Sequence, residues 1–188
     1  MSTATIPGLI TAEQFLEMHF DGPVELVRGE IVEMTRPDKS HGSVCARVSL
    51  SLMQWALPTR QGEVITNDSC ILTERDPDTM RGADVAFVPA NLLRNGRLPR
   101  GNQSLGMIPT LCVEVLSPSN SWSEMRRKID EYLTVGVHEV WIVDPELHTV
   151  ELFRSDSGSA LFRESQTLAS VELPGFSVAV ADFFAGVE

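Results

Sequence analysis

The hydrophobic positions of this chain fall into runs of two kinds, and together they predict a mixed α/β fold. Short apolar runs rich in β-branched residues predict buried strands over 83–88, 111–116 and 138–143. Apolar residues three and four positions apart predict a helix over about 41–57 and another from about 121 to 136. Residues 111–143 should therefore form a strand, a helix and a second strand.

Shorter patterns predict further elements towards both ends of the chain. They are a helix over 11–19 capped by Thr11, a hairpin over 24–34 that turns at Arg28-Gly29, two strands over 62–74 broken at Asn67-Asp68, and strands over 150–154, 160–164 and 168–173. The 188 residues, with 43% hydrophobic content, are enough for one core. We expect a single domain over 1–188, with its core over about 10–145 and a β-rich C-terminal extension over 146–188.

Composition restricts the kind of protein. No apolar run approaches the roughly 18 residues that cross a membrane, and the N-terminus lacks the basic and apolar regions of a signal peptide, so a cytoplasmic protein is expected. The three cysteines have neither disulfide-framework nor zinc-site spacing and are expected to be buried apolar residues. The net charge of −11 argues against non-specific binding of polyanions.

Two of the predicted strands carry a carboxylate within an apolar run. Asp84 interrupts the strand over 83–88, and Glu114 interrupts the strand over 111–116. Acidic side chains are rarely buried without a partner, so each should face a cation, a hydrogen-bond donor or a metal. If the two acids meet in a core, they need a cation between them or a shared proton.

The helix that follows the second acid supplies one candidate cation. At about 100° per residue, Lys128 lies about 40° from Tyr132, at the edge of the apolar stripe of the helix. Arg127, Asp130 and Glu131 are expected to point away. Lys128 is therefore the cation of this helix that is predicted to face the body of the protein.

These residue types favour phosphodiester hydrolysis. The chain has no GxSxG, HExxH or GxxxxGK motif, which argues against serine-triad, zinc-protease and NTPase chemistry. Two carboxylates and a backbone carbonyl are hard oxygen ligands that suit Mg²⁺ or Mn²⁺. Such an ion polarises a phosphate and lowers the pKa of a bound water, and a nearby ammonium can orient that water.

Other polar positions allow two interpretations each. Alternation in the predicted hairpin places Glu25 either in solvent or beside a site. His41, in the first turn of a helix, is either an exposed or capping residue or part of a site. The loop over 89–109 has no acidic residue and is either a solvated connection or a phosphate-binding loop. Its basic residues are Arg94, Arg97 and Arg100.

Several segments in combination resemble a known family. They are ELVRGEIVEM, RGADVAFVP, VEVLSPSN, KIDEYLTVGVHEVWIVDP and LPGF, with a histidine at a helix start after the first of them. Together they resemble the Uma-type restriction endonuclease family (DUF820-like), a branch of the PD-(D/E)XK nuclease superfamily, over about residues 10–184. The resemblance implies an α/β (α+β) restriction-endonuclease-like protein. Its αβββαβ core would have a mixed central sheet flanked by helices, with extra strands in the N- and C-terminal parts.

The resemblance also implies metal-dependent cleavage of DNA by a homodimer. Carried over to this chain, Asp84, Glu114 and the Val115 carbonyl would hold Mg²⁺ or Mn²⁺. The superfamily motif has its lysine at the position of Leu116, and here Lys128 from the following helix would take its place.

Two other positions match the family pattern. Glu25 and His41 correspond to positions that often border the site in this family, so the resemblance strengthens the site interpretation for both and leaves both interpretations open.

Two functions from different classes remain open. In the first, the protein is a Mg²⁺-dependent endodeoxyribonuclease with Asp84, Glu114 and Lys128 as catalytic residues. In the second, it is a non-catalytic binding or regulatory module whose buried acids are satisfied by Lys128 and hydrogen bonds. A hydrolase of another phosphodiester, such as RNA or a sugar phosphate, is a third. The acidic net charge requires that a dimer gather arginines along one groove or that the substrate be smaller than duplex DNA.

Overall fold

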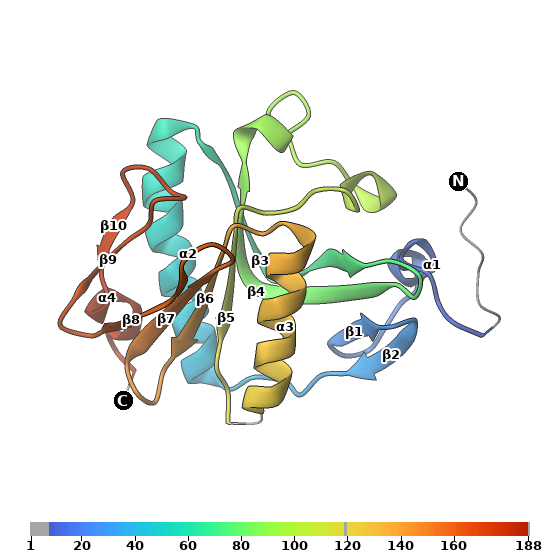
Figure 1. The fold of residues 1–188 in the computed structure, drawn as a ribbon, viewed down its shortest axis with the longest axis horizontal. Coiled ribbons are helices and arrows are strands. Elements are labelled where there is room, and N and C mark those ends of the chain that lie inside the picture. Colours follow the sequence, from blue (N-terminus) through green and yellow to red (C-terminus); the bar gives the residue numbers. More distant parts are fainter. Residues whose placement is uncertain (1–7, 119, 188) are drawn as a thin grey trace.

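The computed structural model describes residues 8–118 and 120–187 and shows an αβββαβ core with additions at both ends (Figure 1). The core elements are α2 (Lys39–Thr59), β3 (Gly62–Glu74), β4 (Thr79–Pro89), β5 (Leu111–Val115), α3 (Trp122–Val135) and β6 (Glu139–Asp144). The N-terminal addition consists of α1 (Ala12–Glu17), β1 (Val24–Val27) and β2 (Glu30–Glu33). The C-terminal addition consists of β7 (Thr149–Arg154), β8 (Gly158–Arg163), β9 (Thr167–Ala169), β10 (Ser177–Ala179) and α4 (Ala181–Phe184). The predicted fold class is confirmed.

The central sheet is mixed, and its strand order is β2-β1-β4-β5-β6-β7-β8, with β3 also paired to β4. Strands β5 and β6 are parallel, because α3 carries the chain back between them, and the other neighbouring strands are antiparallel. The extension over 146–188 thus continues the sheet through β7 and β8. The ends of the predicted domain, residues 1–7 and 188, and also Ser119, lie outside the described residues.

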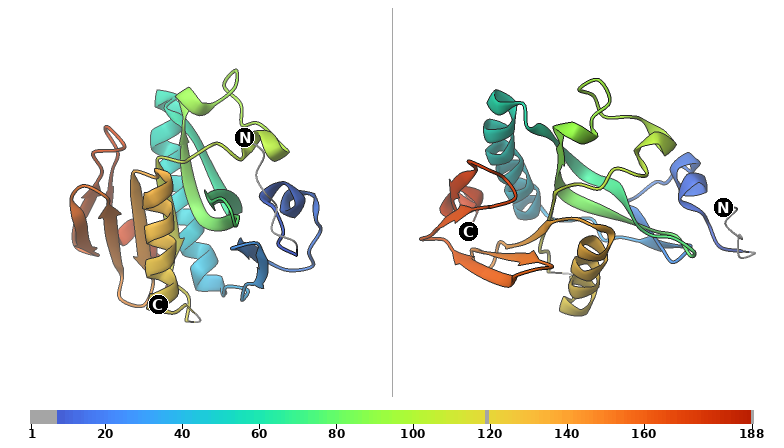
Figure 2. Two further views of the ribbon diagram at one scale, coloured as in Figure 1. Left: turned by 45° about the vertical axis from the view of Figure 1, so that its right-hand side comes forward. Right: turned by 45° about the horizontal axis from the view of Figure 1, so that its top comes forward.

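Two helices cover opposite faces of this sheet (Figures 1 and 2). The face under α2 buries Val44, Val48 and Leu52 against the odd-numbered residues of β5, together with apolar residues that follow β8. The face under α3 buries Ile129 and Tyr132 against Cys112 of β5 and Val140 and Ile142 of β6. Alternate residues of β5 therefore belong to different clusters, as the pleat of a strand requires.

Capping fixes the starts of both large helices. Ser121 accepts a hydrogen bond from the backbone N–H of Glu124, whose side chain accepts one in return from the Ser121 backbone. Gly136 ends α3 with a φ of 110°, which suits glycine. Asp38 caps α2 by accepting from the backbone N–H of His41 at 2.9 Å. His41 is thereby held in the first turn of α2, at the edge of the sheet layer.

One predicted break in the chain is wrong. Residues 62–74 form the single strand β3 rather than two strands, although Asn67 and Asp68 have positive φ angles of 67° and 53°. The pairing of β3 with β4 shifts register between Thr66 and Ser69, which is a β-bulge. The bulge accommodates both left-handed residues without ending the strand. It also directs Asp68 towards a cavity described below.

The helices of the described residues include none that is both long and apolar enough to cross a lipid bilayer.

The core on the α2 face predicts the effect of a matched pair of substitutions. Leu52 is fully buried, whereas Leu50 on the same helix is 55% exposed. Leu52→Ala should lower the free energy of unfolding by about 2–5 kcal/mol, because it leaves a cavity. Leu50→Ala should change that free energy by less than about 0.5 kcal/mol. Urea unfolding followed by circular dichroism measures both, and equal losses would contradict the assignment of the core.

Candidate active site

Charged side chains from strands and helices converge on one cavity of about 270 Å³. The cavity lies where β1, β4 and β5 meet the N-terminal parts of α2 and α3. The charged residues that line it include Glu25, His41, Asp68, Arg81, Asp84, Glu114, Arg127 and Lys128. The sequence-predicted Asp84, Glu114, Lys128, Glu25 and His41 are thus brought together.

Asp84 joins the adjacent strands at this cavity. Strands β4 and β5 pair with Val85 opposite Val113, which sets Asp84 beside the end of β5. Its Oδ2 accepts a hydrogen bond from the Val115 backbone N–H at 2.7 Å. The same oxygen lies 3.2 Å from His41 Nε2, and the Asp84 side chain is 13% exposed. Asp84 therefore reaches both the tip of β5 and the start of α2.

Glu114 is buried, with partners on both carboxylate oxygens. Tyr132 donates its hydroxyl to Oε1 at 2.7 Å, and Lys128 Nζ lies 3.2 Å from Oε2. Burial raises the pKa of Glu114 to about 7, and the charge of Asp84 acts in the same direction while Lys128 opposes it. The predicted position of Lys128 is matched by the structure, because α3 turns this side chain inward beside Glu114.

Glu25 is buried, so the solvent-exposed interpretation is wrong. Its Oε1 lies 2.8 Å from Lys128 Nζ and its Oε2 lies 2.8 Å from Arg81. The backbone N–H of Gly82 donates to Glu25 as well, at 3.2 Å. Burial alone would raise the pKa of Glu25, but the charges and hydrogen bonds of Lys128 and Arg81 outweigh it and lower that pKa. Glu25 therefore holds Lys128 from the side opposite Glu114.

Arg81 and Glu131 are two residues of the cluster that the sequence did not reveal. Glu131 is buried rather than pointing away, and its Oε1 accepts from Arg81 at 2.7 Å. By helical phase Glu131 lies about 100° from Tyr132, beyond Lys128, and Arg81 on β4 pairs with it there. The signal that could have identified the pair was an arginine within an apolar strand.

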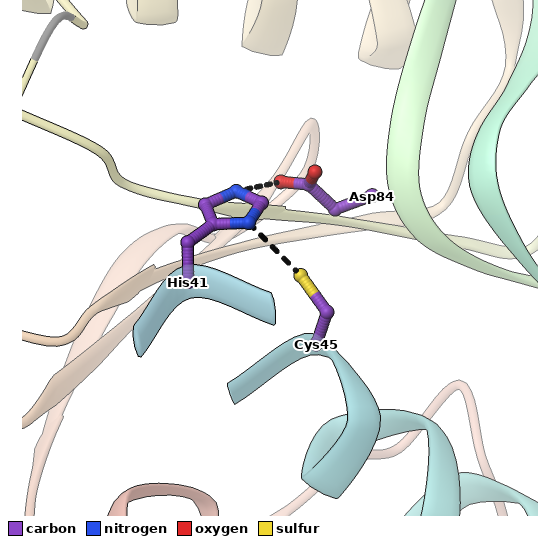
Figure 3. A group of neighbouring side chains, drawn as sticks. All are labelled: His41, Cys45 and Asp84. Carbon is purple, nitrogen blue, oxygen red and sulfur yellow. Dashed lines mark hydrogen bonds and ion pairs between the residues drawn. The ribbon is translucent and has the colours of Figure 1, made fainter. Parts of the chain in front are cut away.

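His41 is 6% exposed, so its interpretation as an exposed residue is wrong, although its backbone N–H does take part in the cap of α2. Its imidazole lies between Asp84 and Cys45, with Cys45 Sγ 3.5 Å from Nδ1 (Figure 3). Burial acts to lower the pKa of His41, but the hydrogen bond and charge of Asp84 and a hydrogen bond to the Val115 backbone raise it. Asp84 therefore stabilises the imidazolium form of His41 relative to that of a free histidine.

The cysteines only partly follow the prediction that all three are buried. Cys112 is buried, Cys45 is half-buried beside His41, and Cys70 is exposed on β3. Cys70 follows the bulge of β3 and precedes Ile71, which is buried in the cluster under α3, so the alternation of the strand turns Cys70 to the other face.

The basic loop lies away from the cavity. Arg94, Arg97 and Arg100 are exposed on the connection between β4 and β5, which enters β5 at the end opposite Val115. Arg94 donates to Gln103 within the same loop, at 3.2 Å. None of the three arginines is among the residues that line the cavity. Their contact with phosphate stays a prediction, and it would involve a stretch of substrate distant from the carboxylates.

The family is shown by a match over most of the chain. The Uma2 family model, described as "Putative restriction endonuclease", matches residues 12–181. The chain belongs to the Uma2 family. The resemblance stated from sequence motifs is thereby confirmed.

One solved structure supports the fold of this Uma2 protein. It is described as "a putative nuclease belonging to DUF820" from Anabaena variabilis ATCC 29413. It superposes with a TM-score of 0.77 over 94% of this chain and 98% of its own, at 19% sequence identity. At that identity, the likeness shows the fold alone. No curated protein matches the chain significantly.

The donor set at the cavity of this Uma2 protein fits a hard divalent cation. Asp84, Glu114 and Asp68 supply carboxylate oxygens around the cavity. Burial raises the pKa of Asp68, and the charge of Asp84 acts in the same direction against the opposing charges of Lys128 and His41. Oxygen donors and excess negative charge are the conditions under which Mg²⁺ or Mn²⁺ binds.

The pKa of Glu114 predicts how stability depends on pH in the presence of a chelator. Its folded-state pKa, about 7, is above the ordinary 4.5, so its contribution to stability is full below about pH 4.5 and is lost as pH rises to about 7. Glu114→Gln should therefore flatten the fall in the free energy of unfolding over this interval, by on the order of 1–3 kcal/mol.

Urea unfolding at several pH values measures this effect. Glu146→Gln, at an exposed position, is the control and should keep the wild-type profile. An unchanged profile in Glu114→Gln would show that this carboxyl group does not take up a proton in the folded state.

Proposed function

We propose that this Uma2 protein is a divalent-metal-dependent endodeoxyribonuclease that hydrolyses phosphodiester bonds of DNA. The observation that carries the proposal is the convergence of Asp84, Glu114 and Lys128 at one cavity, from two adjacent strands and the helix that follows them. The family supports a nuclease, and the donor set supports the metal. Catalytic roles for these three residues are part of the proposal.

The proposed metal ligands are Asp84, Glu114 and the carbonyl of Val115. A bound Mg²⁺ or Mn²⁺ would supply Lewis-acid polarisation of the scissile phosphate and a lowered pKa of a bound water. The protein positions these oxygens by backbone pairing, because the Val115 N–H holds Asp84 against the end of β5. The ligands thus lie on paired strands rather than on loops.

Lys128 contributes a fixed positive charge. The charges of Glu114 and Glu25 raise the pKa of Lys128 above its ordinary value despite burial, so the side chain stays protonated at neutral pH. A protonated amine cannot accept a proton from water. Lys128 therefore acts by donating hydrogen bonds to the attacking water or to phosphate oxygens, where it offsets negative charge that develops during hydrolysis.

Glu25 and His41 are proposed as accessory residues. Glu25 positions Lys128 through the 2.8 Å ion pair and is itself held by Arg81. His41 contacts Asp84 directly. Glu25 thus acts on the ammonium of Lys128, and His41 acts on the carboxylate of Asp84.

DNA as the substrate requires a basic contact surface on an acidic protein. Arg127 lines the cavity and is exposed, so it is placed to contact a phosphate next to the one that is cleaved. A homodimer, which the family resemblance implies, would bring two such sites to one duplex and belongs to the same proposal. Cytoplasmic location, where DNA is accessible, belongs to it as well.

One observation favours the alternative, a non-catalytic module. Among the described residues, no buried side-chain nitrogen or oxygen lacks a hydrogen-bond partner. Lys128 and Tyr132 already satisfy Glu114, so burial of this acid does not itself require a metal. Calorimetry with Mg²⁺ and Mn²⁺ separates the two functions, because a module predicts no binding at millimolar metal.

The nuclease proposal predicts that Asp84→Asn abolishes activity. The amide cannot supply an anionic ligand, so divalent-dependent nicking of supercoiled plasmid should fall by at least about 100-fold while the thermal unfolding midpoint stays within a few degrees. Asp130→Asn, on the exposed face of α3, is the matched control and should keep wild-type activity. Equal nicking by wild type, Asp84→Asn and a metal-free sample would refute the proposal.

The position of Arg127 predicts a second measurable effect. Arg127→Ala should weaken DNA binding, and it should reduce the slope of log affinity against log salt by about 1, because one phosphate contact is lost. Fluorescence anisotropy over a salt series measures the slope. Arg126→Ala, exposed and outside the cavity lining, is the control.

The same assay tests the basic loop. If the combined replacement of Arg94, Arg97 and Arg100 by alanine lowers the slope and Arg127→Ala does not, DNA follows the loop and not the cavity.

A further inference from the structure

We propose that His41 is a nitrogen ligand of the divalent metal at this site, and that it makes the site selective for Mn²⁺ over Mg²⁺. The proposal rests on the proposed function, because it assumes that Asp84 holds a metal. It adds a ligand and a metal preference that neither the family nor the oxygen donors supply.

The spacing of the donor atoms carries the proposal. His41 Nε2 lies 3.2 Å from Asp84 Oδ2. Two neighbouring ligands of an octahedral ion, each at about 2.1 Å, are about 3.0 Å apart. The nitrogen and the oxygen are therefore separated as two ligands of one ion would be, and only small shifts would admit the ion between them.

The orientation of the His41 imidazole is fixed by a contact on Nδ1, the ring nitrogen that does not face Asp84. His41 and Cys45 are four residues apart on α2, so they share one face of the helix, and Sγ lies 3.5 Å from Nδ1. Metal binding would displace the Nε2 proton that Asp84 stabilises in the metal-free site, and the neutral ring, with its Nδ1–H donated to this sulfur, would direct the Nε2 lone pair to an ion beside Asp84 (Figure 3). Metal-binding histidines are usually held in this way, by a hydrogen bond on the nitrogen that does not bind the metal.

Cys45 itself is not a ligand in this arrangement, although its sulfur, His41 and Asp84 have donor atoms within 4.8 Å of one another. Figure 3 shows the sulfur and the carboxylate on different edges of the ring. The sulfur contacts Nδ1 at 3.5 Å, on the nitrogen that does not face Asp84. The donor set is one nitrogen with oxygens.

A nitrogen donor changes the metal preference. Mg²⁺ is hard and strongly prefers oxygen, whereas first-row transition ions gain affinity from imidazole. With carboxylates and a backbone carbonyl completing the set, Mn²⁺ uses both donor types, while Mg²⁺ gains little from His41. His41 thus selects the metal, and the carboxylates retain it.

Isothermal titration calorimetry of the full chain tests the selectivity. Wild type should bind Mn²⁺ at least about tenfold more tightly than Mg²⁺, and His41→Ala should weaken Mn²⁺ binding by about tenfold or more, while Mg²⁺ binding changes by less than about threefold. Cys45→Ala should have a smaller effect of the same kind. His138→Ala, at a side chain that is 61% exposed in the turn between α3 and β6, is the control and should match wild type.

A spectroscopic measurement on wild type avoids any effect of substitution on folding. Electron spin echo modulation of the Mn²⁺-loaded protein should show coupling to a directly bound imidazole nitrogen. Its absence, or equal weakening of both metals in His41→Ala, would overturn the His41 proposal while leaving the metal-dependent function standing. If wild type binds neither metal, both proposals fail. Asp84→Asn separates these cases, because it should remove both metals if the carboxylate site is real.

Discussion

The shared ammonium of Lys128 is the interaction on which the rest of the site depends. Two carboxylates from non-adjacent parts of the chain, Glu25 and Glu114, share this ammonium, because Nζ lies 2.8 Å from one and 3.2 Å from the other. Arg81 and Glu131 continue the alternation of charges. Removal of one partner from such a network leaves an uncompensated buried charge, at a cost of about 3–5 kcal/mol. The network therefore joins β1, β4, β5 and α3 through charge, where apolar packing alone would not orient them.

The features that local periodicity controls could be predicted from the sequence. Asp84 and Glu114 stand out because an acid in an apolar strand is costly, and Lys128 follows from helical phase alone. The order of the core elements has the same origin, since alternation, capping at Ser121 and Asp38, and the glycine at the end of α3 are all local signals. What periodicity predicts is the direction of a side chain relative to its own element.

The features that depend on contacts between distant elements could not be predicted. Glu25 is buried because β1 pairs with β4, and no local pattern encodes that pairing. Glu131 turns inward because Arg81 faces it from β4. The clustering of arginines in the 89–109 loop also did not predict where they lie relative to the cavity. This loop joins β5 at Leu111, the end of the strand away from its carboxylate. Asn67 and Asp68, a turn pair by composition, form a bulge because β4 offers a continuous partner.

The same geometry is compatible with a nuclease and with a non-catalytic module. The distribution of charge around the cavity bears on the choice between these two functions. Lys128 and Arg81 neutralise the inner part of the network, around Glu25, Glu114 and Glu131. The outer part contains Asp68 and Asp84, with His41 beside Asp84, and the charges of Lys128 and His41 offset only part of the rise in the pKa of Asp68. The raised pKa values of Asp68 and Glu114 both have the charge of Asp84 among their causes, so electrostatic repulsion is concentrated on the cavity side. Burial is the largest cause of both shifts, and a divalent ion bound beside Asp84 would relieve the repulsion among these acids, which is the electrostatic support for the proposed metal site.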